Sequence, residues 1–232
     1  MVRREGNIAN HKRVQRLMQE MKLYAIHPKP NLSKKDKYAS IYPYLLRDLK
    51  IIKPHQVWQT DITYLRTRQG FMYLTAIIDV YSRKVLSYNL ANNLGAENCI
   101  AALNAAVYKY GAAEIVNSDQ GAQFTSEIWK ESLVKYGAKI SMTGQGRCCD
   151  NVYIERLWRA FKYEGSYLYE WNSVEALQKN IPRWLQWYNY ERPHQALGYK
   201  TPAEQMYQDN CFYLCSKRYN SDILGGEIMV QL

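Results

Sequence analysis

The sequence lacks any run of about 20 consecutive apolar residues, the length that a membrane-spanning helix needs. Its first residues, MVRREGN, lead into further charged residues and lack the apolar centre of a secretory signal. Its cysteines, five in number with two of them adjacent, do not form the pattern of a disulfide framework. We therefore expect a reduced, cytoplasmic protein with no membrane partner.

Acidic residues are scarce at the N-terminal end. Residues 1–53 contain 13 lysines and arginines against four acidic residues, whereas the rest of the chain is nearly balanced, with 18 against 17. A basic segment on a near-neutral body predicts a polyanionic partner, of which DNA and RNA are the commonest. A solvated basic tail without a partner is the alternative.

The N-terminal segment predicts a short amphipathic helix within 7–25, because Val14, Leu17 and Met18 recur at helical spacing. Cationic side chains lie among them, and we expect these to contact DNA: Lys12, Arg13 and Arg16. Residues 27–37 are polar and contain prolines, as a linker does.

Three domains are expected. They are a basic helical DNA-contacting arm with its linker over 1–53, a folded core over 54–207, and a tail without an assigned role over 208–232. An amphipathic helix that packs on the core is the alternative for the arm.

The core begins with three runs rich in β-branched and aromatic residues, 56–66, 71–80 and 84–90. Short turns separate them, which predicts a three-strand antiparallel meander. The elements expected next are a helix ending at Gly111, a strand at 114–118, a helix at 126–136 with Ser126 as N-cap, a strand at 138–142, and helices at 150–165 and 173–190, the last interrupted or restarted at Pro182. This order predicts an α/β layer fold with a mixed sheet and flanking helices.

Three acidic residues stand out by position. Asp61 lies in the middle of an apolar strand, where a carboxylate is costly to bury unless it is paired or bound to a metal. Asp119 lies where a strand ends, and active sites of α/β proteins gather at this edge of the sheet. Glu155 lies in the helix at 150–165, where a projection at about 100° per residue places Arg159 and Lys162 beside it.

Carboxylates from two strands and a helix suit Mg²⁺, which prefers hard oxygen ligands and keeps water and substrate phosphate in its shell. Two such ions can activate the attacking oxygen and stabilise the leaving oxygen of a phosphodiester displacement. Arg159 and Lys162 would then meet DNA phosphates. Helix caps or salt-bridge partners are the alternative roles for any single acid of the three.

The segments WQTDITY (58–64), NSDQG (117–121) and DNVYIE (150–155) resemble the catalytic core of transposases of the IS3 insertion-sequence family and, more distantly, retroviral integrases. The second and third acids are separated by 35 residues, the spacing after which the D,D(35)E motif of that family is named. Lys162 matches the basic residue of the family in the same helix. The segment 188–198, YNYERPHQALG, is similar to its C-terminal signature.

The resemblance implies a ribonuclease-H-like fold, dependence on Mg²⁺ or Mn²⁺, and DNA transposition by two-metal-ion cleavage and strand transfer. It assigns metal binding and catalysis to Asp61, Asp119 and Glu155. The partners that it implies are DNA (element ends and target), further copies of the chain and a separately encoded DNA-binding protein, at the bacterial nucleoid. A hydrolytic nuclease of the same fold and a truncated, inactive DNA-binding remnant are the alternatives.

Other residues have weaker patterns. Asp79, which precedes Arg83, is interpreted as a structural acid. His194 either contacts DNA or packs its loop, and Asn151 either steadies the active-site loop or contacts DNA. The aromatic group from Trp184 to Tyr190 is interpreted as core rather than a base-stacking surface.

Overall fold

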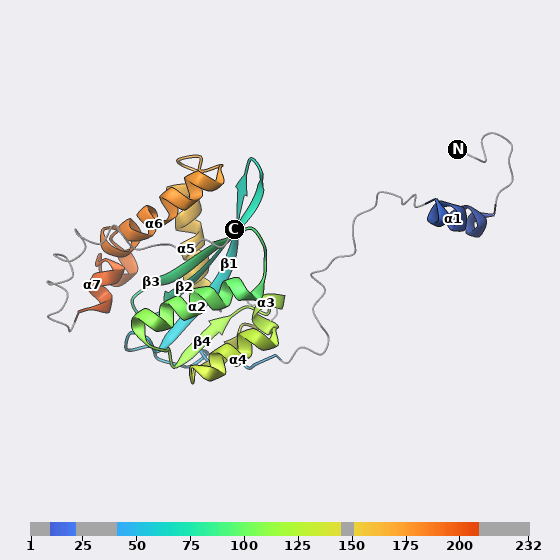
Figure 1. The fold of residues 1–232 in the computed structure, drawn as a ribbon. Helices are drawn as coiled ribbons and strands as arrows, with labels where there is room; N and C mark the ends of the chain where they lie inside the picture. Colours follow the sequence, from blue (N-terminus) through green and yellow to red (C-terminus); the bar gives the residue numbers. More distant parts are fainter. Residues whose placement is uncertain (1–9, 22–40, 145–150, 209–232) are drawn as a thin grey trace. The chain divides into compact units, whose positions relative to one another are not determined.

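The computed structural model describes residues 10–21, 41–144 and 151–208 (Figure 1). The chain divides into two units, Met1–Lys34 and Lys35–Leu232. In the first unit, helix α1 (His11–Glu20) begins after Asn10, whose side chain accepts a hydrogen bond from the backbone N–H of Lys12 (2.9 Å). No helix of the described ranges has the length and apolar character needed to cross a membrane.

The core is built on a five-stranded sheet in the order β3-β2-β1-β4-β5. Strands β1 (Val57–Thr67), β2 (Gly70–Asp79) and β3 (Val85–Ala91) form the antiparallel meander that the sequence predicts. Strands β4 (Ile115–Ser118) and β5 (Lys139–Met142) then add in parallel to β1. The result is a mixed sheet.

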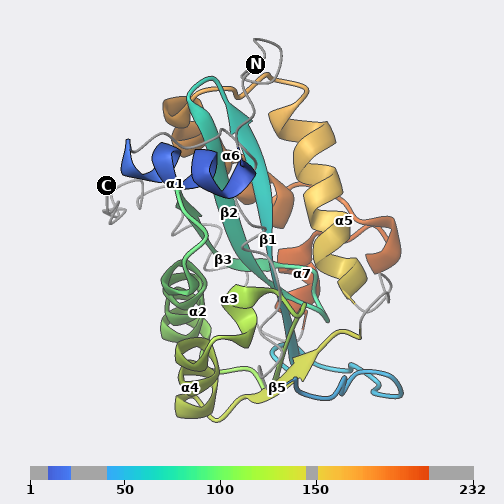
Figure 2. The ribbon, with the colours of Figure 1, turned by 90° about the vertical axis from the view of Figure 1, so that its right-hand side faces the viewer.

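Helices cover both faces of this sheet (Figures 1 and 2). One face carries α2 (Ala96–Tyr110), α3 (Ala122–Thr125) and α4 (Glu127–Lys135), which pack over Trp58 and Ile77. The other carries α5 (Val152–Phe161) and α6 (Val174–Tyr190), which pack over Leu74 and Ile78. A short helix, α7 (Pro202–Met206), follows a 3₁₀ turn, η4 (Gln195–Leu197).

The helix expected at 150–165 is present, but its last turn is of another type. After Phe161 the chain widens into a π-helix, η3 (Lys162–Ser166). Phe161 stacks edge-on against Trp184 with ring centroids 5.0 Å apart, and a Cβ at Gly165 would lie 2.9 Å from Cδ1 of the same indole. The wider turn and the missing side chain together let the backbone approach the indole closely.

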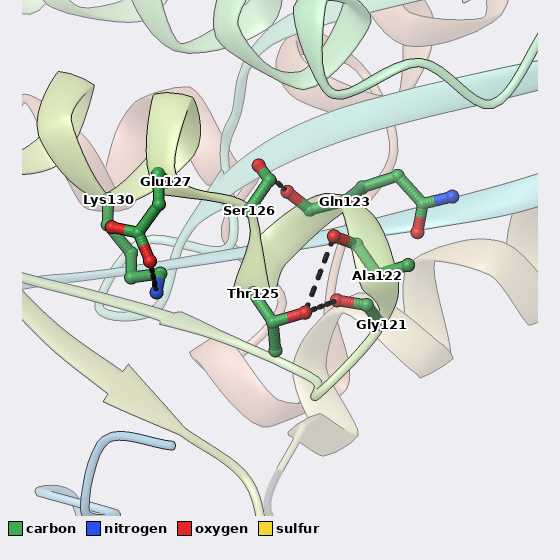
Figure 3. A network of polar contacts seen from close by, with 7 residues as sticks. All are labelled: Gly121, Ala122, Gln123, Thr125, Ser126, Glu127 and Lys130. Atoms are coloured by element: carbon green, nitrogen blue, oxygen red, sulfur yellow. Dashed lines mark hydrogen bonds and ion pairs between the residues drawn. The ribbon is translucent and has the colours of Figure 1, made fainter. Parts of the chain in front are cut away.

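Two further local predictions need correction. Helix α6 runs through Pro182 without interruption, because buried residues on both sides of the proline, Ile181 and Trp184, hold it against the sheet. Ser126 does precede α4, but its hydroxyl donates to the carbonyl of Gln123 (2.7 Å) and caps no helix N–H (Figure 3).

The boundary predicted at 53/54 differs from the division of the chain, which falls after Lys34. Residues 41–53 belong to the second unit. Their side chains Leu46, Leu49 and Ile51 pack against a small cluster of buried apolar residues. The backbone N–H of Leu45 also donates to the hydroxyl of Ser141 in β5 (3.0 Å). Apart from Gln208, the tail expected over 208–232 lies outside the described residues.

A buried lysine just before β3 contacts the residue that follows α7. Lys84 is 1 % exposed, and its Nζ donates to the hydroxyl of Tyr207 (2.8 Å). The same ammonium lies 4.4 Å from the ring centroid of Tyr207 and 5.2 Å from those of Tyr110 and Tyr190. Burial lowers the pKa of Lys84 to about 7, and the charge of Lys109 acts in the same direction.

We expect the stability of the protein to rise with pH above 7. Between the folded-state pKa of Lys84, about 7, and its ordinary value of 10.5, the unfolded chain binds a proton that the folded chain does not. The free energy of unfolding should therefore increase by roughly 1–2 kcal/mol between pH 7 and 9 in the parent, and much less in Lys84→Met. Urea unfolding at each pH measures this.

The matched control is Lys135→Met, because Lys135 is exposed at the end of α4. This variant should keep the pH dependence of the parent. Equal profiles for the parent and Lys84→Met would contradict the prediction.

Candidate active site

The first predicted aspartate lies in β1, and the second directly follows the neighbouring strand β4. β1 and β4 pair in parallel, with Gln59 opposite Asn117. Asp61 and Asp119 each come two residues after these partners, so both lie at the same level of the sheet, just where β4 ends. Side chains two residues apart in a strand share a face, so Gln59 and Asp61 both point to the side covered by α5.

The turn after β4 holds the carboxylate of Asp119. Its Oδ1 accepts a hydrogen bond from the backbone N–H of Gly121 (2.8 Å). A Cβ at Gly121 would lie 3.0 Å from that oxygen, so a larger residue would press on the carboxylate. The hydroxyl of Thr125 closes the same corner by donating to the carbonyl of Gly121 (3.1 Å; Figure 3).

Buried amides attach the start of α5 to the sheet. Oε1 of Gln59 accepts from the backbone N–H of Ile154 (3.3 Å), and Nδ2 of Asn117 donates to Oδ1 of Asn151 (3.4 Å). The hydroxyl of Ser141 in β5 donates to Oδ1 of Asn117 (2.8 Å). Glu155 directly follows Ile154, so these contacts set its position against the two aspartates.

The carboxyl group of Asp61 is half-buried beside the other two acids. Burial raises its pKa to about 6, and the negative charges of Asp119 and Glu155 act in the same direction. Opposing them are a hydrogen bond from the backbone of Ile62 and one from the indole N–H of Trp158 to Oδ2 (3.0 Å). The charges of all three acids therefore act in one region.

Trp158 was assigned by the sequence to the packing side of α5 alone. The structure confirms that packing, since Trp158 lies in the cluster beneath the sheet, and adds the hydrogen bond to Asp61. The spacing of Trp158 three residues after Glu155 could have suggested this second contact, because such positions are neighbours on a helix.

The donor set fits a hard divalent cation. Three carboxylates supply the oxygen ligands that Mg²⁺ prefers, and a cation would offset both the burial of the Asp61 carboxylate and its repulsion by the other two acids. In the ranges that the structure describes, no three His, Cys, Asp or Glu side chains lie close enough together to form a ready-made metal site. Glu155 is exposed, whereas both aspartates are half-buried.

The predicted DNA-contacting cations fall into two groups. Arg159 is exposed on α5 and Lys162 is half-buried at the start of η3, both on the helix of Glu155. The others lie exposed on α1, in the first unit, which has no defined placement against the core: Lys12, Arg13 and Arg16. Arg16 pairs with Glu20 over 3.5 Å.

The structure shows the surroundings of the residues with weaker patterns, while DNA contact by His194 or Asn151 stays a prediction. Asp79 is a structural acid, since it is buried and accepts hydrogen bonds from the backbone N–H of His55 and from Ser82. His194 packs its loop, edge-on against Tyr188 with ring centroids 4.8 Å apart. Of the aromatic group on α6, Trp184 and Tyr188 are buried, whereas 36 % of Trp187 is exposed. Asn151 is buried and holds the start of α5.

Models of the integrase core domain match residues 52–148 and 136–202, and a model of an HTH-like domain matches residues 1–31. A protein named as a transposase, InsK of insertion sequence element IS150 from Escherichia coli, is 32 % identical over 205 residues, which cover 87 % of this chain and 72 % of that protein. The chain belongs to the insertion-sequence transposases of the IS3 family.

Another relative is the transposase InsF of insertion sequence IS3A from Escherichia coli, 29 % identical over 78 % of this chain and 61 % of that protein. Among solved structures, the catalytic core domain of HTLV-2 integrase in complex with magnesium, in its trimeric form, has a TM-score of 0.57 at 21 % identity and covers 68 % of this chain and 99 % of that one. The fold of the transposase is thus the ribonuclease-H-like fold that the sequence predicts. Its function is DNA transposition, a form of polynucleotidyl transfer.

We expect Asp61 to destabilise the transposase in metal-free buffer. The folded-state pKa of about 6 exceeds the ordinary value of 3.8, so the folded chain binds more protons between these pH values and stability falls as pH rises through them. Asp61→Asn should therefore raise the free energy of unfolding at pH 7.5 by roughly 1–3 kcal/mol. Urea unfolding in the presence of a chelator measures the difference.

The matched control is Glu131→Gln, which removes an exposed acid on α4 and should change stability little. If Asp61→Asn is instead less stable than the parent, the carboxylate is not under the electrostatic strain described.

Proposed function

We propose that the transposase cleaves DNA at the ends of its element and joins them to target DNA through two Mg²⁺ or Mn²⁺ ions held by Asp61, Asp119 and Glu155. The observation that carries this proposal is the register of β1 and β4, which sets Asp61 beside Asp119 at the helix that carries Glu155. Burial and the charges of the other two acids raise the pKa of Asp61, a half-buried carboxyl group. Such a group favours a bound cation over the bare ionised state.

The chemistry that the ions would supply is stabilisation of the attacking and the leaving oxygens in a phosphodiester displacement. The chain's own residues would bind and orient them. Gln59 and Asn117 hold the start of α5, the helix that carries Glu155, and Trp158 donates a hydrogen bond to the carboxylate of Asp61. A bound cation would offset the repulsion among the three acids.

DNA binding is proposed for two regions. The HTH-like segment at 1–31 would contact DNA through Lys12, Arg13 and Arg16, while Arg159 and Lys162 would contact the strand at the active site. We also propose that the transposase acts as a homo-oligomer on DNA, which the trimeric form of the HTLV-2 core supports, and with a separately encoded DNA-binding protein.

Replacing one acid should abolish the chemistry and leave DNA binding intact. For Asp119→Asn and Glu155→Gln we expect cleavage and joining of element-end DNA with Mg²⁺ to fall by roughly a thousandfold or more, because several kcal/mol of transition-state stabilisation is lost. The assay is a gel that separates nicked from joined products, with binding followed separately by fluorescence anisotropy.

The control Glu131→Gln should cleave and join as the parent does. Nicked ends without joined products in the parent would favour a hydrolytic nuclease of the same fold. No cleavage by the parent, with DNA binding retained, would favour an inactive DNA-binding remnant.

The cations of α1 should contribute to the salt dependence of DNA binding. Each phosphate neutralised contributes about −0.9 to the slope of log affinity against log salt, so changing Lys12, Arg13 and Arg16 together to Gln should flatten it by up to about 2.7. The variant with Arg13→Lys and Arg16→Lys keeps the charge and should keep the slope. An unchanged slope in the triple variant would show that α1 does not contact the DNA backbone.

A further inference from the structure

A cationic hollow of about 460 Å³ lies on the flank of α5. Its lining comes from α5, from η3 and from the turn that follows α6: Arg156, Arg159, Ala160, Tyr163, Glu164 and Arg192. Three guanidinium groups thus face one carboxylate. Arg156 and Arg192 were not singled out by the sequence analysis.

Arg192 is held in place across the hollow. Its Nε and Nη2 donate to the two carboxylate oxygens of Glu164, at 2.6 Å each. The guanidinium carbon also lies 6.0 Å from the ring centroid of Trp187 and 5.9 Å from that of Tyr188. The hydrogen bonds fix the N–H groups of the Arg192 guanidinium, and the aromatic rings lie near it. Little conformational freedom of this side chain therefore remains to be lost when an anion binds.

The other two arginines have no such partner. Arg156 and Arg159 are both exposed, and neither forms an ion pair with another described residue. The hollow therefore has two positive charges in excess of its carboxylate. Guanidinium forks match the oxygens of a phosphate better than any other side chain does.

The hollow begins next to the active site. Arg159 lies one helical turn after Glu155, which is about 6 Å along α5, and Tyr163 lies one turn further, about 12 Å from Glu155. A DNA strand carries a phosphate about every 3.4 Å along the helix axis. A strand that runs along α5 from a reacting phosphate at Glu155 would therefore place its next phosphates over the hollow.

We propose that the hollow formed by Arg156, Arg159 and Arg192 binds backbone phosphates of the DNA strand beyond the reacting phosphate. Glu164 holds Arg192 in position in the unbound protein and competes with the phosphate for it. This inference rests on the proposed function, because DNA is its ligand, but it concerns binding and not the metal-dependent chemistry.

The test uses the full chain and double-stranded element-end DNA in buffer with a chelator, so that binding is measured without catalysis. Arg156→Gln and Arg192→Gln should each weaken binding about three- to tenfold at low salt and flatten the salt slope by about 0.9 per lost phosphate contact. The matched control is Arg183→Gln, an exposed arginine of α6 outside the lining, which should keep the affinity and slope of the parent.

Glu164→Gln separates a binding role from a structural one. If Arg192 binds phosphate, removing its competitor should leave DNA affinity unchanged or raise it severalfold, whereas Arg192→Gln lowers it. If Arg192 serves only to pair with Glu164, the two variants should weaken binding or folding equally, which would overturn the proposal. Thermal unfolding of each variant identifies a folding defect.

The outcomes also separate this inference from the proposed function. Suppose that Arg156→Gln and Arg192→Gln bind DNA like the parent and that the parent cleaves and joins DNA. This result would overturn the proposal that the hollow binds phosphates and leave the proposed function intact. If both variants bind DNA more weakly and the parent binds DNA without cleaving it, phosphate binding by the hollow would be supported and the metal-dependent function overturned.

Discussion

The parallel pairing of β1 with β4 is the constraint on which the proposed active site depends. Its register places Gln59 opposite Asn117, and therefore sets Asp61 beside Asp119 at the point where β4 ends. The same two amides then reach the first turn of α5. One register thus positions two acids through the backbone and the third, Glu155, through buried side-chain hydrogen bonds.

This arrangement brings like charges together in a partly buried place, where repulsion is strong because water is partly excluded. The fold supports that strain through hydrogen bonds at both aspartates, from Trp158 to Asp61 and from the backbone of Gly121 to Asp119. Glu155, by contrast, is exposed on its helix. The candidate site is therefore fixed by hydrogen bonds on the sheet side and exposed on the helix side.

Patterns local in the sequence predicted much of this fold, because alternating β-branched and aromatic residues mark the three meander strands to within one residue. The acids themselves were predicted from their places on strands and helix. The roles of Gln59 and Asn117 were not, because they depend on a strand register that no local pattern specifies. The packing of 41–53 was missed for the same reason, since the apolar residues of that segment meet their partners only in the folded core.

The most direct test of the account is the location of bound metal in crystals of the transposase with element-end DNA and Mn²⁺, by anomalous scattering. Two anomalous peaks next to the carboxylates of Asp61, Asp119 and Glu155 are the predicted result. Mn²⁺ bound elsewhere on the core, with Glu155 directed away from both aspartates, would contradict the assignment of these three residues as the catalytic metal ligands.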